Sequence, residues 1–440
     1  MLEAIGLPDL ESLFADVPPE LQVKGELNLP RALSEPELIA RLQGIACMNG
    51  NSSEYSLFLG AGAYHHFVPP VVEEVISREE FYTAYTPYQP ELSQGLLQSA
   101  YEYQTLICQL TGMEIANASL YDGASAVAES ALMACRILQR KRVLVSSALH
   151  PDYLTVLRTY LSHLGIELEP IPWLSEKGIT SFPEAERRLD SEVAAIILQS
   201  PNFFGCLEEG VEFARIAHAQ GALLISVLVE PTSLGVLKPP GEWGADIVAG
   251  EGQSFGNSLN FGGPYLGIFA TREKFVRQIP GRLVGRTIDA QGRSGFVLAL
   301  GTREQHIRRE KATSNICTNE ALCALAAAVH LCLLGPQGLA QLASLNLQKS
   351  HYARERIARL PGFELPFSAP TYNEFVVRMP RPVEETNSKL LERRIIGGLN
   401  LGRFFPEMED CCLFCVTEMN TKKQIDHLVD SLDQLTRGGI

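Results

Sequence analysis

Continuous apolar stretches alternate with amphipathic stretches through the middle of the chain. The apolar stretches lie at 143–146, 194–199 and 223–229, and stretches with helical spacing lie between them at 151–164 and 211–220. Gly165 and Gly221 follow the two amphipathic stretches, at positions where glycine commonly ends a helix. A strand that is apolar on both sides must be covered on both sides. The pattern therefore predicts an α/β fold with a mostly parallel sheet between two layers of helices.

Two segments precede this region. Ser34 and Glu37 form a capping-box pattern, which predicts the start of a helix that continues through Leu42. We therefore expect residues 1–70 to be a helical N-terminal segment. The next tract is rich in proline and tyrosine, and it predicts an extended, ordered arm over 77–95 within a large domain of residues 71–335.

The pattern changes after a helix predicted over Asn319–Leu334. Strands are predicted at Glu374–Arg378 and Cys411–Val416. Thr421, with Gln424 three residues later, predicts the start of a last helix. These elements indicate a smaller C-terminal α/β domain over 336–440.

The charge and the apolar runs limit the classes of partner. The 440 residues carry a formal net charge of −14, which disfavours nucleic acid because phosphate binding needs a basic surface. Mixed charges over Arg303–Lys311 are typical of a solvated face or a subunit contact. The longest apolar run, Ala321–Gly335, is interrupted by His330 and is too short to span a bilayer. The first residues are acidic where a signal peptide is basic, so we expect a cytoplasmic protein without membrane contact.

The ten cysteines are scattered along the chain, which favours reduced thiols. Residues 411–415 contain one C-x-x-C pattern, but no second such pair and no nearby histidine pair completes a zinc set. We interpret this stretch as a buried strand and expect no metal site, with a metal or redox role as the alternative.

One stretch has the composition of a phosphate-binding helix start. Tyr121-Asp-Gly-Ala-Ser-Ala-Val-Ala begins with turn residues and continues as a small-residue helix, with Ser125 in its first turn. Small residues let a ligand approach the free N–H groups, and the helix dipole favours an anion there. The same composition also suits a helix that packs closely on a sheet, so both interpretations stay open.

Polar residues follow the next predicted strands in an order typical of pyridoxal-phosphate enzymes. His150, the residues 202–205 and Glu230 lie near strand ends, where ligands of open α/β sheets bind. Such an enzyme needs an acid at the pyridine nitrogen, for which Glu230 is the candidate, and a lysine for the Schiff base. We expect that lysine one strand later, at Gly250-Glu-Gly-Gln-Ser-Phe-Gly-Asn257, but this turn contains none. The lysines nearest in sequence are Lys238, Lys274 and Lys311.

Several long motifs resemble one family. They are Thr83-Ala-Tyr-Thr-Pro-Tyr-Gln-Pro-Glu-Leu-Ser-Gln-Gly95, Ile115-Ala-Asn-Ala-Ser-Leu, Lys238-Pro-Pro-Gly-Glu, Gly244-Ala-Asp-Ile-Val and Ile307-Arg-Arg-Glu-Lys-Ala-Thr-Ser-Asn-Ile-Cys317. Over essentially its whole length the chain is similar to the N-terminal half, or subunit 1, of the glycine decarboxylase P-protein of the glycine cleavage system. The resemblance implies a fold type I, pyridoxal-phosphate-dependent transferase-like large domain. It also aligns Gln253 with the Schiff-base lysine of the other half, and Glu230 with a position where aspartate is usual.

The resemblance implies that the chain's own cofactor site is vestigial. The vestigial site comprises Ser125, His150, Glu230 and Gln253, with no catalytic residue, since an amide cannot form a Schiff base. Pyridoxal phosphate would then be held covalently by P-protein subunit 2 in an α2β2 heterotetramer, which acts on glycine and transfers an aminomethyl group to the lipoylated H-protein.

The resemblance also implies residues that act at the contact between unlike subunits. Thr313, Ser314 and Asn315 would bind the cofactor phosphate of the partner, and Tyr85, Tyr88, Gln89 and Gln94 would line the substrate entrance. Tight packing of these residues in the interface, without ligand contact, is the alternative. Two other hypotheses for the whole chain remain: a self-sufficient pyridoxal-phosphate enzyme that uses a nearby lysine, and a purely structural partner of the catalytic subunit.

Overall fold

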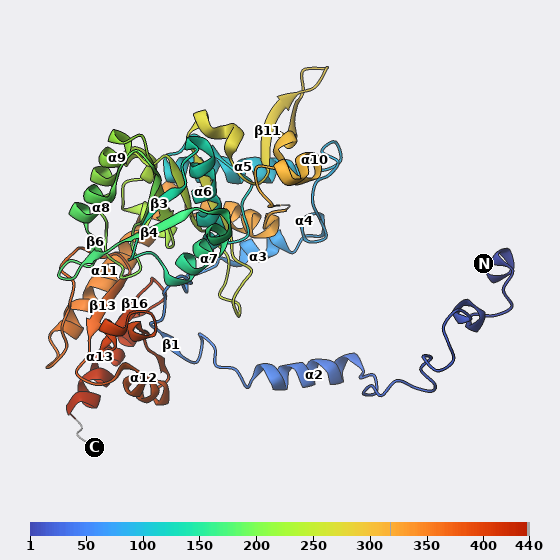
Figure 1. The fold of residues 1–440 in the computed structure, drawn as a ribbon. Coiled ribbons are helices and arrows are strands. Elements are labelled where there is room, and N and C mark those ends of the chain that lie inside the picture. Colours follow the sequence, from blue (N-terminus) through green and yellow to red (C-terminus); the bar gives the residue numbers. More distant parts are fainter. Residues whose placement is uncertain (317, 438–440) are drawn as a thin grey trace. The chain divides into compact units, whose positions relative to one another are not determined.

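The computed structural model describes residues 1–316 and 318–437, and the chain divides into two compact units, Met1–Glu54 and Tyr55–Ile440. Figure 1 gives the course of the chain and the labels of the elements. Cys317, the last residue of one family motif, lies outside the described residues.

The first unit contains three short helical elements and no buried residue. They are α1 (Leu2–Ile5), the 3-10 helix η1 (Glu11–Phe14) and α2 (Glu35–Ala46). The predicted capping box is confirmed, because Glu37 Oε2 accepts from the backbone N–H of Ser34 at 2.8 Å. The helix continues beyond Leu42 to Ala46. The prediction of a helical segment over 1–70 is wrong for its last part, where residues 56–57 form a strand.

A seven-stranded sheet forms the centre of the second unit, in the order β2-β10-β9-β8-β7-β3-β4. Its strands are β2 (Ile115–Ala116), β3 (Arg142–Ser146), β4 (Glu167–Ile171), β7 (Val193–Gln199), β8 (Leu223–Leu228), β9 (Ile247–Glu251) and β10 (Gly267–Thr271). β3, β4, β7, β8 and β9 are parallel, and β10 is antiparallel to both of its neighbours, β9 and β2, so β2 runs in the same direction as the five parallel strands. The predicted mostly parallel sheet is therefore confirmed.

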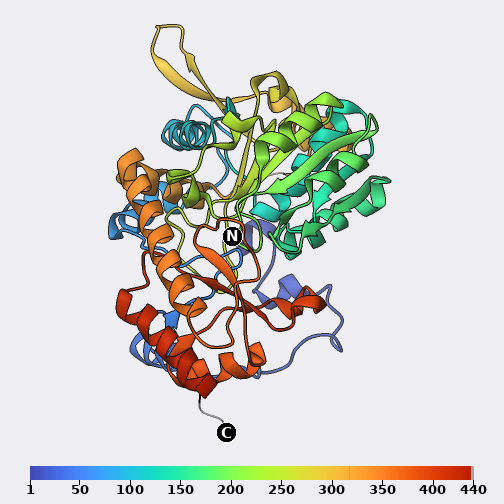
Figure 2. The ribbon, with the colours of Figure 1, turned by 90° about the vertical axis from the view of Figure 1, so that its left-hand side faces the viewer.

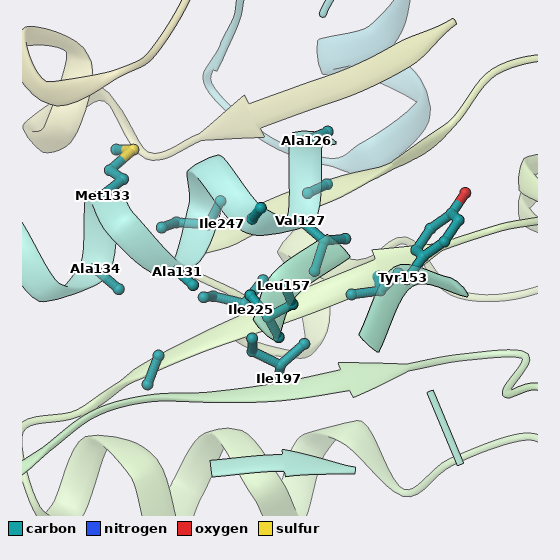
Figure 3. Close-up of a cluster of buried hydrophobic side chains, with 14 of the residues drawn as sticks. Ala126, Val127, Ala131, Met133, Ala134, Tyr153, Leu157, Ile197, Ile225 and Ile247 are labelled. Atoms are coloured by element: carbon teal, nitrogen blue, oxygen red, sulfur yellow. The ribbon is translucent and has the colours of Figure 1, made fainter. Parts of the chain in front are cut away.

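Helices cover both faces of this sheet. α6 (Gly123–Leu138) and α7 (Pro151–Leu161) pack on one face, where Val127 and Leu157 meet Ile197 and Ile225 in one buried cluster (Figure 3). α8 (Phe182–Arg188) and α9 (Gly210–Ala219) contribute to a cluster on the other face. These helices bury the alternate sides of the same apolar strands, as the sequence pattern requires.

The long helix α11 (Ala321–Ala358) is kinked at Gly335, whose φ of 58° is left-handed, directly before Pro336. By length and composition it is the one helix of the described residues able to cross a membrane, but half of its most apolar window is buried in the fold. It packs with α5 (Gln94–Thr111) in the protein core. The kink lies at the boundary predicted between the domains 71–335 and 336–440, a division that stays a prediction.

The tract predicted as an extended arm is only partly extended. α3 (Pro70–Ile76) precedes it, α4 (Glu79–Tyr82) lies within it, and residues 83–93 then lack helix and strand until α5 begins. The short helix α4 shows that part of the predicted arm 77–95 is helical, because the tyrosines and prolines that broke the pattern occur mainly after it.

The C-terminal part contains a second, smaller sheet (Figure 2). Its sheet has the order β13-β16-β15, and the small strand β1 pairs with β14 in parallel. Its elements are β1 (Ser56–Leu57), β13 (Glu374–Arg378), α12 (Val383–Glu392), β14 (Ile395–Ile396), β15 (Leu399–Asn400), β16 (Cys411–Cys415) and α13 (Lys422–Arg437). β16 is buried throughout, which confirms the interpretation of the cysteine-rich stretch as a strand, and Thr421 caps α13 through Gln424 as predicted.

The remaining elements are short and connect this framework. They are β5 (Trp173–Leu174), β6 (Ile179–Thr180), β11 (Leu283–Ile288), β12 (Ser294–Ala299), α10 (Gln305–Arg308) and the 3-10 helices at Ser162–Leu164, Pro231–Gly235, Pro240–Trp243, Glu273–Gln278, Gly301–Arg303, Arg309–Lys311, Leu401–Arg403 and Pro406–Met408.

Candidate functional site

The residues of the predicted vestigial site follow the carboxyl ends of parallel strands. His150 caps α7 after β3, Glu230 follows β8, and Gln253 follows β9. Ser125 lies in the first turn of α6. All four are buried, and one segment without helix or strand, residues 61–67, bonds three of them. We call residues 61–67 the inner segment.

Gln253 is fully engaged by the backbone. Its Oε1 accepts from the N–H of Tyr64 at 2.9 Å, and its Nε2 donates to the carbonyls of Tyr64, at 3.2 Å, and of Asn257, at 2.6 Å. Only 2% of the residue is exposed. At the position aligned with the Schiff-base lysine, the chain therefore has an amide that binds its own inner segment.

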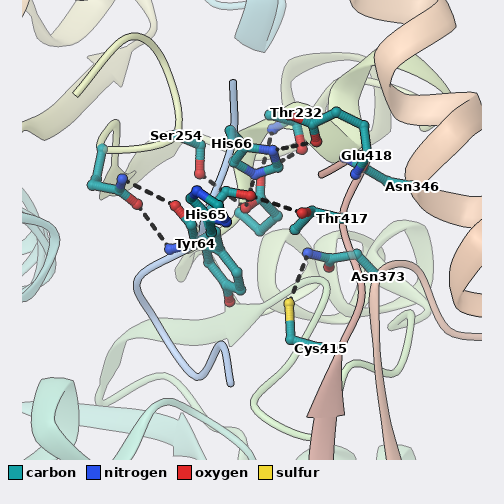
Figure 4. A network of polar contacts seen from close by, with 12 residues as sticks. Tyr64, His65, His66, Thr232, Ser254, Asn346, Asn373, Cys415, Thr417 and Glu418 are labelled. Atoms are coloured by element: carbon teal, nitrogen blue, oxygen red, sulfur yellow. Dashed lines mark hydrogen bonds and ion pairs between the residues drawn. The ribbon is translucent and has the colours of Figure 1, made fainter. Parts of the chain in front are cut away.

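The Glu230 carboxylate is likewise bonded by other groups of the chain. Its Oε1 accepts from the Thr232 backbone N–H at 3.0 Å and from the Thr232 hydroxyl, and its Oε2 accepts from the Ser254 hydroxyl at 2.9 Å. His66 Nε2 lies 3.1 Å from the same Oε2, and His66 Nδ1 lies 2.8 Å from Glu418 Oε2 (Figure 4). The carboxylate expected to face a pyridine nitrogen thus faces an imidazole of the chain itself.

The two carboxylates hold His66 in its charged form. Burial lowers the pKa of the imidazole, but the charge of Glu230 and the hydrogen bonds that the ring donates to Glu230 and Glu418 outweigh it and raise the pKa to about 10. For Glu418, burial acts to raise the pKa, and the bond and charge of His66 bring it below its ordinary value. His66 is therefore a buried cation between two carboxylates.

The start of α6 also has an internal anion. Glu251 Oε2 accepts from the N–H of Gly123 at 2.9 Å, and Glu251 Oε1 accepts from the N–H groups of Gly252, Gln253 and Leu266 at 2.8–3.1 Å. Burial raises the pKa of Glu251 to about 7, although these backbone bonds act to lower it. A carboxylate of the chain thus binds the first N–H of the helix at which a phosphate was considered.

The first turn of α6 leaves little room for another ligand. Asp122 Oδ1 accepts from the N–H of Ser125 at 2.7 Å, so Ser125 belongs to a helix cap. A methyl group added at Gly123 would collide with the Tyr153 hydroxyl and would lie 2.9 Å from the carbonyl carbon of Gly250. These contacts support the alternative interpretation of the small residues, in which they allow the helix to pack closely on the sheet.

His150 is tied to the same inner segment. Its Nδ1 accepts from the Asp152 N–H at 3.2 Å, so its Nε2 donates to the Ala61 carbonyl at 2.8 Å. Burial lowers the pKa of this histidine, which agrees with a neutral ring. His150 therefore acts as a helix cap and a packing residue.

The inner segment is also bonded to the C-terminal part. The Ala61 N–H and the Tyr64 hydroxyl donate to the two oxygens of Glu374, at 2.6 and 2.8 Å. Burial raises the pKa of Glu374 to about 7, and the bonds from Ala61 and Tyr64 act against this rise. The inner segment thus connects strand ends of the central sheet to β13 and to Glu418.

The three lysines nearest in sequence to the expected Schiff-base position make their contacts outside the predicted vestigial site. Lys274 Nζ lies 3.6 Å from Asp246 Oδ1 and over the ring of Phe275. Lys238 lies between the 3-10 helices η3 (Pro231–Gly235) and η4 (Pro240–Trp243), and Lys311 ends the exposed 3-10 helix η7 (Arg309–Lys311). Among the described residues, no hydrogen bond or ion pair joins these lysines to Glu230 or Gln253.

The residues predicted to act on the partner differ in their exposure and in their contacts within the chain. Ser314 Oγ accepts from the Ile316 N–H at 3.1 Å, whereas Asn315 is exposed. Thr313 is half-buried, with its backbone N–H donating to the Arg303 carbonyl at 3.1 Å. Their role towards a partner's cofactor stays a prediction.

The predicted entrance residues divide into two kinds. Tyr85, Tyr88 and Gln89 are exposed, and the two tyrosine rings lie 6.3 Å apart. Gln94 instead joins the start of α5 to β12, because its amide donates to and accepts from the backbone of Phe296. Three of the four residues are thus available to another molecule, and Gln94 has a clear structural role.

These contacts do not fit pyridoxal phosphate at this chain's own site. The phosphate position is bonded by Glu251, the ring-nitrogen acid is bonded by His66, and the Schiff-base position is an amide. The sequence reasoning missed Glu251 and His66. Glu251 lies within the stretch 250–257, where a lysine was expected, but its role depends on a helix start 128 residues away.

The comparisons with known proteins agree on one family. The family model described as glycine cleavage system P-protein matches residues 1–432. The chain is 54% identical, over 99% of its length and 97% of the relative, to the probable glycine dehydrogenase (decarboxylating) subunit 1 of Desulfitobacterium hafniense. It is 51% identical to the protein of the same name from Desulforamulus reducens, over 99% of this chain and 97% of that protein.

Solved structures give the same result at the level of the fold. The chain resembles a crystal structure of glycine decarboxylase (P-protein) of the glycine cleavage system in inhibitor-bound form, with a TM-score of 0.91, 43% identity, and coverage of 99% of this chain and 97% of that one. A sphingosine-1-phosphate lyase of Burkholderia pseudomallei shares the fold at 13% identity, with a TM-score of 0.69 and coverage of 96% and 94%. The predicted fold class, that of fold type I pyridoxal-phosphate-dependent transferases, is confirmed.

Proposed function

The chain belongs to the glycine cleavage system P-protein family, and we propose that it is the subunit of this enzyme that does not hold the Schiff base. Two copies would combine with two copies of subunit 2 in an α2β2 heterotetramer, with pyridoxal phosphate covalently bound to subunit 2. The cytoplasmic complex would decarboxylate glycine and transfer the aminomethyl group to the lipoyl group of H-protein. The isolated chain would be inactive.

The bonding of Gln253 is the observation that carries this proposal. An amide nitrogen cannot form an aldimine, and this amide is used completely by Tyr64 and Asn257. Glu251 and His66 support the proposal independently, since they satisfy the helix start and the acid that a cofactor would need. A cofactor would have to displace bonds that are already made inside the fold.

The role of this chain in the complex would lie at the contact between unlike subunits. The exposed Asn315 and the half-buried Thr313 and Ser314 supply amide and hydroxyl groups suited to a phosphate. The exposed Tyr85, Tyr88 and Gln89 lie on the irregular segment 83–93, which suits a substrate entrance. We propose that both groups complete the catalytic site of the partner.

Reconstitution with subunit 2 tests the proposal. The purified chain should release no carbon dioxide from glycine and should give no borohydride-trapped cofactor. The mixture with subunit 2 should release carbon dioxide, and borohydride should trap the cofactor on subunit 2. Decarboxylation by the isolated chain would overturn the proposal. It would favour the self-sufficient enzyme, which needs Lys238, Lys274 or Lys311 in reach of a bound aldehyde.

A triple variant separates a contributing subunit from a purely structural one. Replacing Thr313, Ser314 and Asn315 by alanine should weaken cofactor retention by the assembled complex at least tenfold, because up to three hydrogen bonds to a phosphate would be lost. The assembled complex is isolated first by size, so that a loss of assembly is distinguished from a loss of cofactor. Unchanged cofactor affinity and turnover would favour the purely structural role.

A further inference from the structure

Arg282 is a buried cation whose hydrogen-bonding capacity is largely unused. Only 6% of the residue is exposed, and neither its Nε nor its Nη1 makes a hydrogen bond with any described residue. Its Nε lies 3.8 Å from Glu304 Oε2, too far for a hydrogen bond, and Glu304 Oε2 is also 3.6 Å from His306 Nδ1. Burying a charge without hydrogen-bonded partners is costly, so a partner for this guanidinium is expected.

The neighbouring Arg303 shows that this part of the fold can satisfy a buried arginine. Arg303 is 8% exposed, similar to Arg282. Its Nη1, Nη2 and Nε donate to the carbonyls of Ile279, Gly281 and Leu300. Arg303 therefore holds the loop before β11, whereas Arg282, in the same loop, has donors without acceptors.

Arg282 also lines a cavity. The cavity has a volume of about 80 Å³, well below the roughly 300–1,000 Å³ of pockets for drug-sized ligands, and its lining is mainly apolar. Phe81, Tyr85, Leu97 and Leu298 form part of the wall, and Asn319 adds a polar group. The Tyr88 ring lies 5.7 Å from the guanidinium carbon. The space suits a group of a few heavy atoms with a short apolar stem.

We propose that Arg282 and this cavity bind a carboxylate with a short apolar stem. A carboxylate accepts two parallel hydrogen bonds from an arginine fork, which Nη2 forms with either Nε or Nη1. Each of these two forks of Arg282 contains one nitrogen that makes no hydrogen bond with a described residue, and the apolar wall excludes water from the contact. The carboxylate comes either from a small free acid or from an acidic side chain of the partner subunit. The second source rests on the proposed function; the first does not.

Binding of propionate to the purified full chain tests the chemistry without cofactor or partner. Propionate should bind saturably and raise the melting temperature, and propionamide, which has the same shape without the charge, should bind at least tenfold more weakly. R282M should weaken propionate binding at least tenfold. R286M is the matched control, because Arg286 is exposed on β11 and bonds Ser294, and it should leave the binding unchanged.

R282M is expected to fold, since it replaces a buried cation that makes no hydrogen bond through Nε or Nη1 and lies 3.8 Å from Glu304 Oε2 by an apolar side chain in a mainly apolar cavity. R282K gives a second measurement: it keeps the charge but lacks the planar fork, so it should bind propionate more weakly than the parent chain and more tightly than R282M. Propionamide that binds as tightly as propionate, or an R282M that retains the parent affinity, would overturn the proposal.

The complex with subunit 2 then identifies the source. If the partner supplies the carboxylate, assembly abolishes propionate binding and R282M weakens assembly at least tenfold. If a free acid is the ligand, propionate still binds the complex and R282M assembles normally. A parent chain that fails to bind propionate, together with normal assembly of R282M, would contradict both forms of the proposal.

Discussion

Gln253 is surrounded by residues that would prevent a simple exchange from restoring a cofactor site. We expect Q253K to form no aldimine with pyridoxal phosphate, because Glu251 still bonds the start of α6 and His66 still bonds Glu230. Lysine also leaves the Tyr64 N–H without its acceptor, so the free energy of unfolding should fall by about 2–4 kcal/mol. Absorbance of the aldimine and borohydride trapping measure the first effect, and denaturant unfolding measures the second.

Q253A is the control for this variant, since it removes the same amide without adding an amine. It should be destabilised by a similar amount and should also give no trapped cofactor. A stable borohydride adduct at position 253 in Q253K alone would show that the internal contacts yield to the cofactor.

His66 gives the stability of the protein a dependence on pH. Its pKa in the folded state, about 10, is above the unfolded value of 6.5. Its contribution is therefore fully present below pH 6.5 and is lost as the pH rises through about 10. Between these values the free energy of unfolding should fall by up to about 1.4 kcal/mol per pH unit on account of this residue.

H66Q should remove this dependence. The amide can still bond a carboxylate but carries no charge, so at pH 7 the variant should be less stable by about 3 kcal/mol. Urea unfolding at pH 6, 8 and 9.5 measures both effects. H163Q is the matched control, because His163 is exposed. This variant should keep the parent chain's slope of the free energy of unfolding against pH. An H66Q slope equal to that of the parent chain would show that another group dominates this range.

Among the helices, α6 depends most clearly on the absence of a side chain at its start. The first residue, Gly123, lies against the Tyr153 hydroxyl and the backbone of Gly250, so G123A should lower the free energy of unfolding by about 3 kcal/mol. Gly95 is in the first turn of α5 and has no atom within 4 Å of an added methyl group. G95A should be neutral or more stable by about 0.5–1 kcal/mol. Thermal unfolding of the two variants measures the difference between their stabilities. A G123A variant as stable as the parent chain would show that the start of α6 can move.

The elements that could be predicted from the sequence are those determined by local patterns. β3, β7, β8 and the helices between them follow from apolar runs and terminal glycines, and α2 and α13 follow from capping residues. α4 and the strand β1 could not be predicted, because a four-residue helix has little periodicity and β1 is stabilised by pairing with β14, more than 300 residues later.

The residues of the candidate site also divide into those that the sequence predicts and those that it does not. The position of Gln253 after β9 follows from the order of strands and from the family motif. His66 could not be identified, since its partners Glu230 and Glu418 are 164 and 352 residues away. Buried ion pairs of this kind depend on tertiary packing, which a single sequence does not display.

At the scale of the whole molecule, the unit Met1–Glu54 has many apolar side chains and no core. It exposes sixteen large hydrophobic side chains, nearly half of those exposed among the described residues. Leu38, Leu42 and Ile45 lie on one face of α2, at a spacing typical of a helix that packs against another surface. With nine acidic and three basic residues in the same unit, a partner surface with apolar grooves and a basic rim would suit it.

A chain that lacks residues 1–54 tests this role. Since no residue of this unit is buried, its removal should leave the melting temperature of the remaining chain unchanged within about 2 °C. On the proposed function, the apolar side chains are covered by subunit 2, so the truncated chain should bind subunit 2 at least tenfold more weakly in analytical ultracentrifugation. The triple variant L38S/L42S/I45S should weaken assembly in the same direction while the unit stays present. Because these side chains contribute to no core, the variant should also melt as the parent chain does; normal assembly of both proteins would contradict a docking role for the unit.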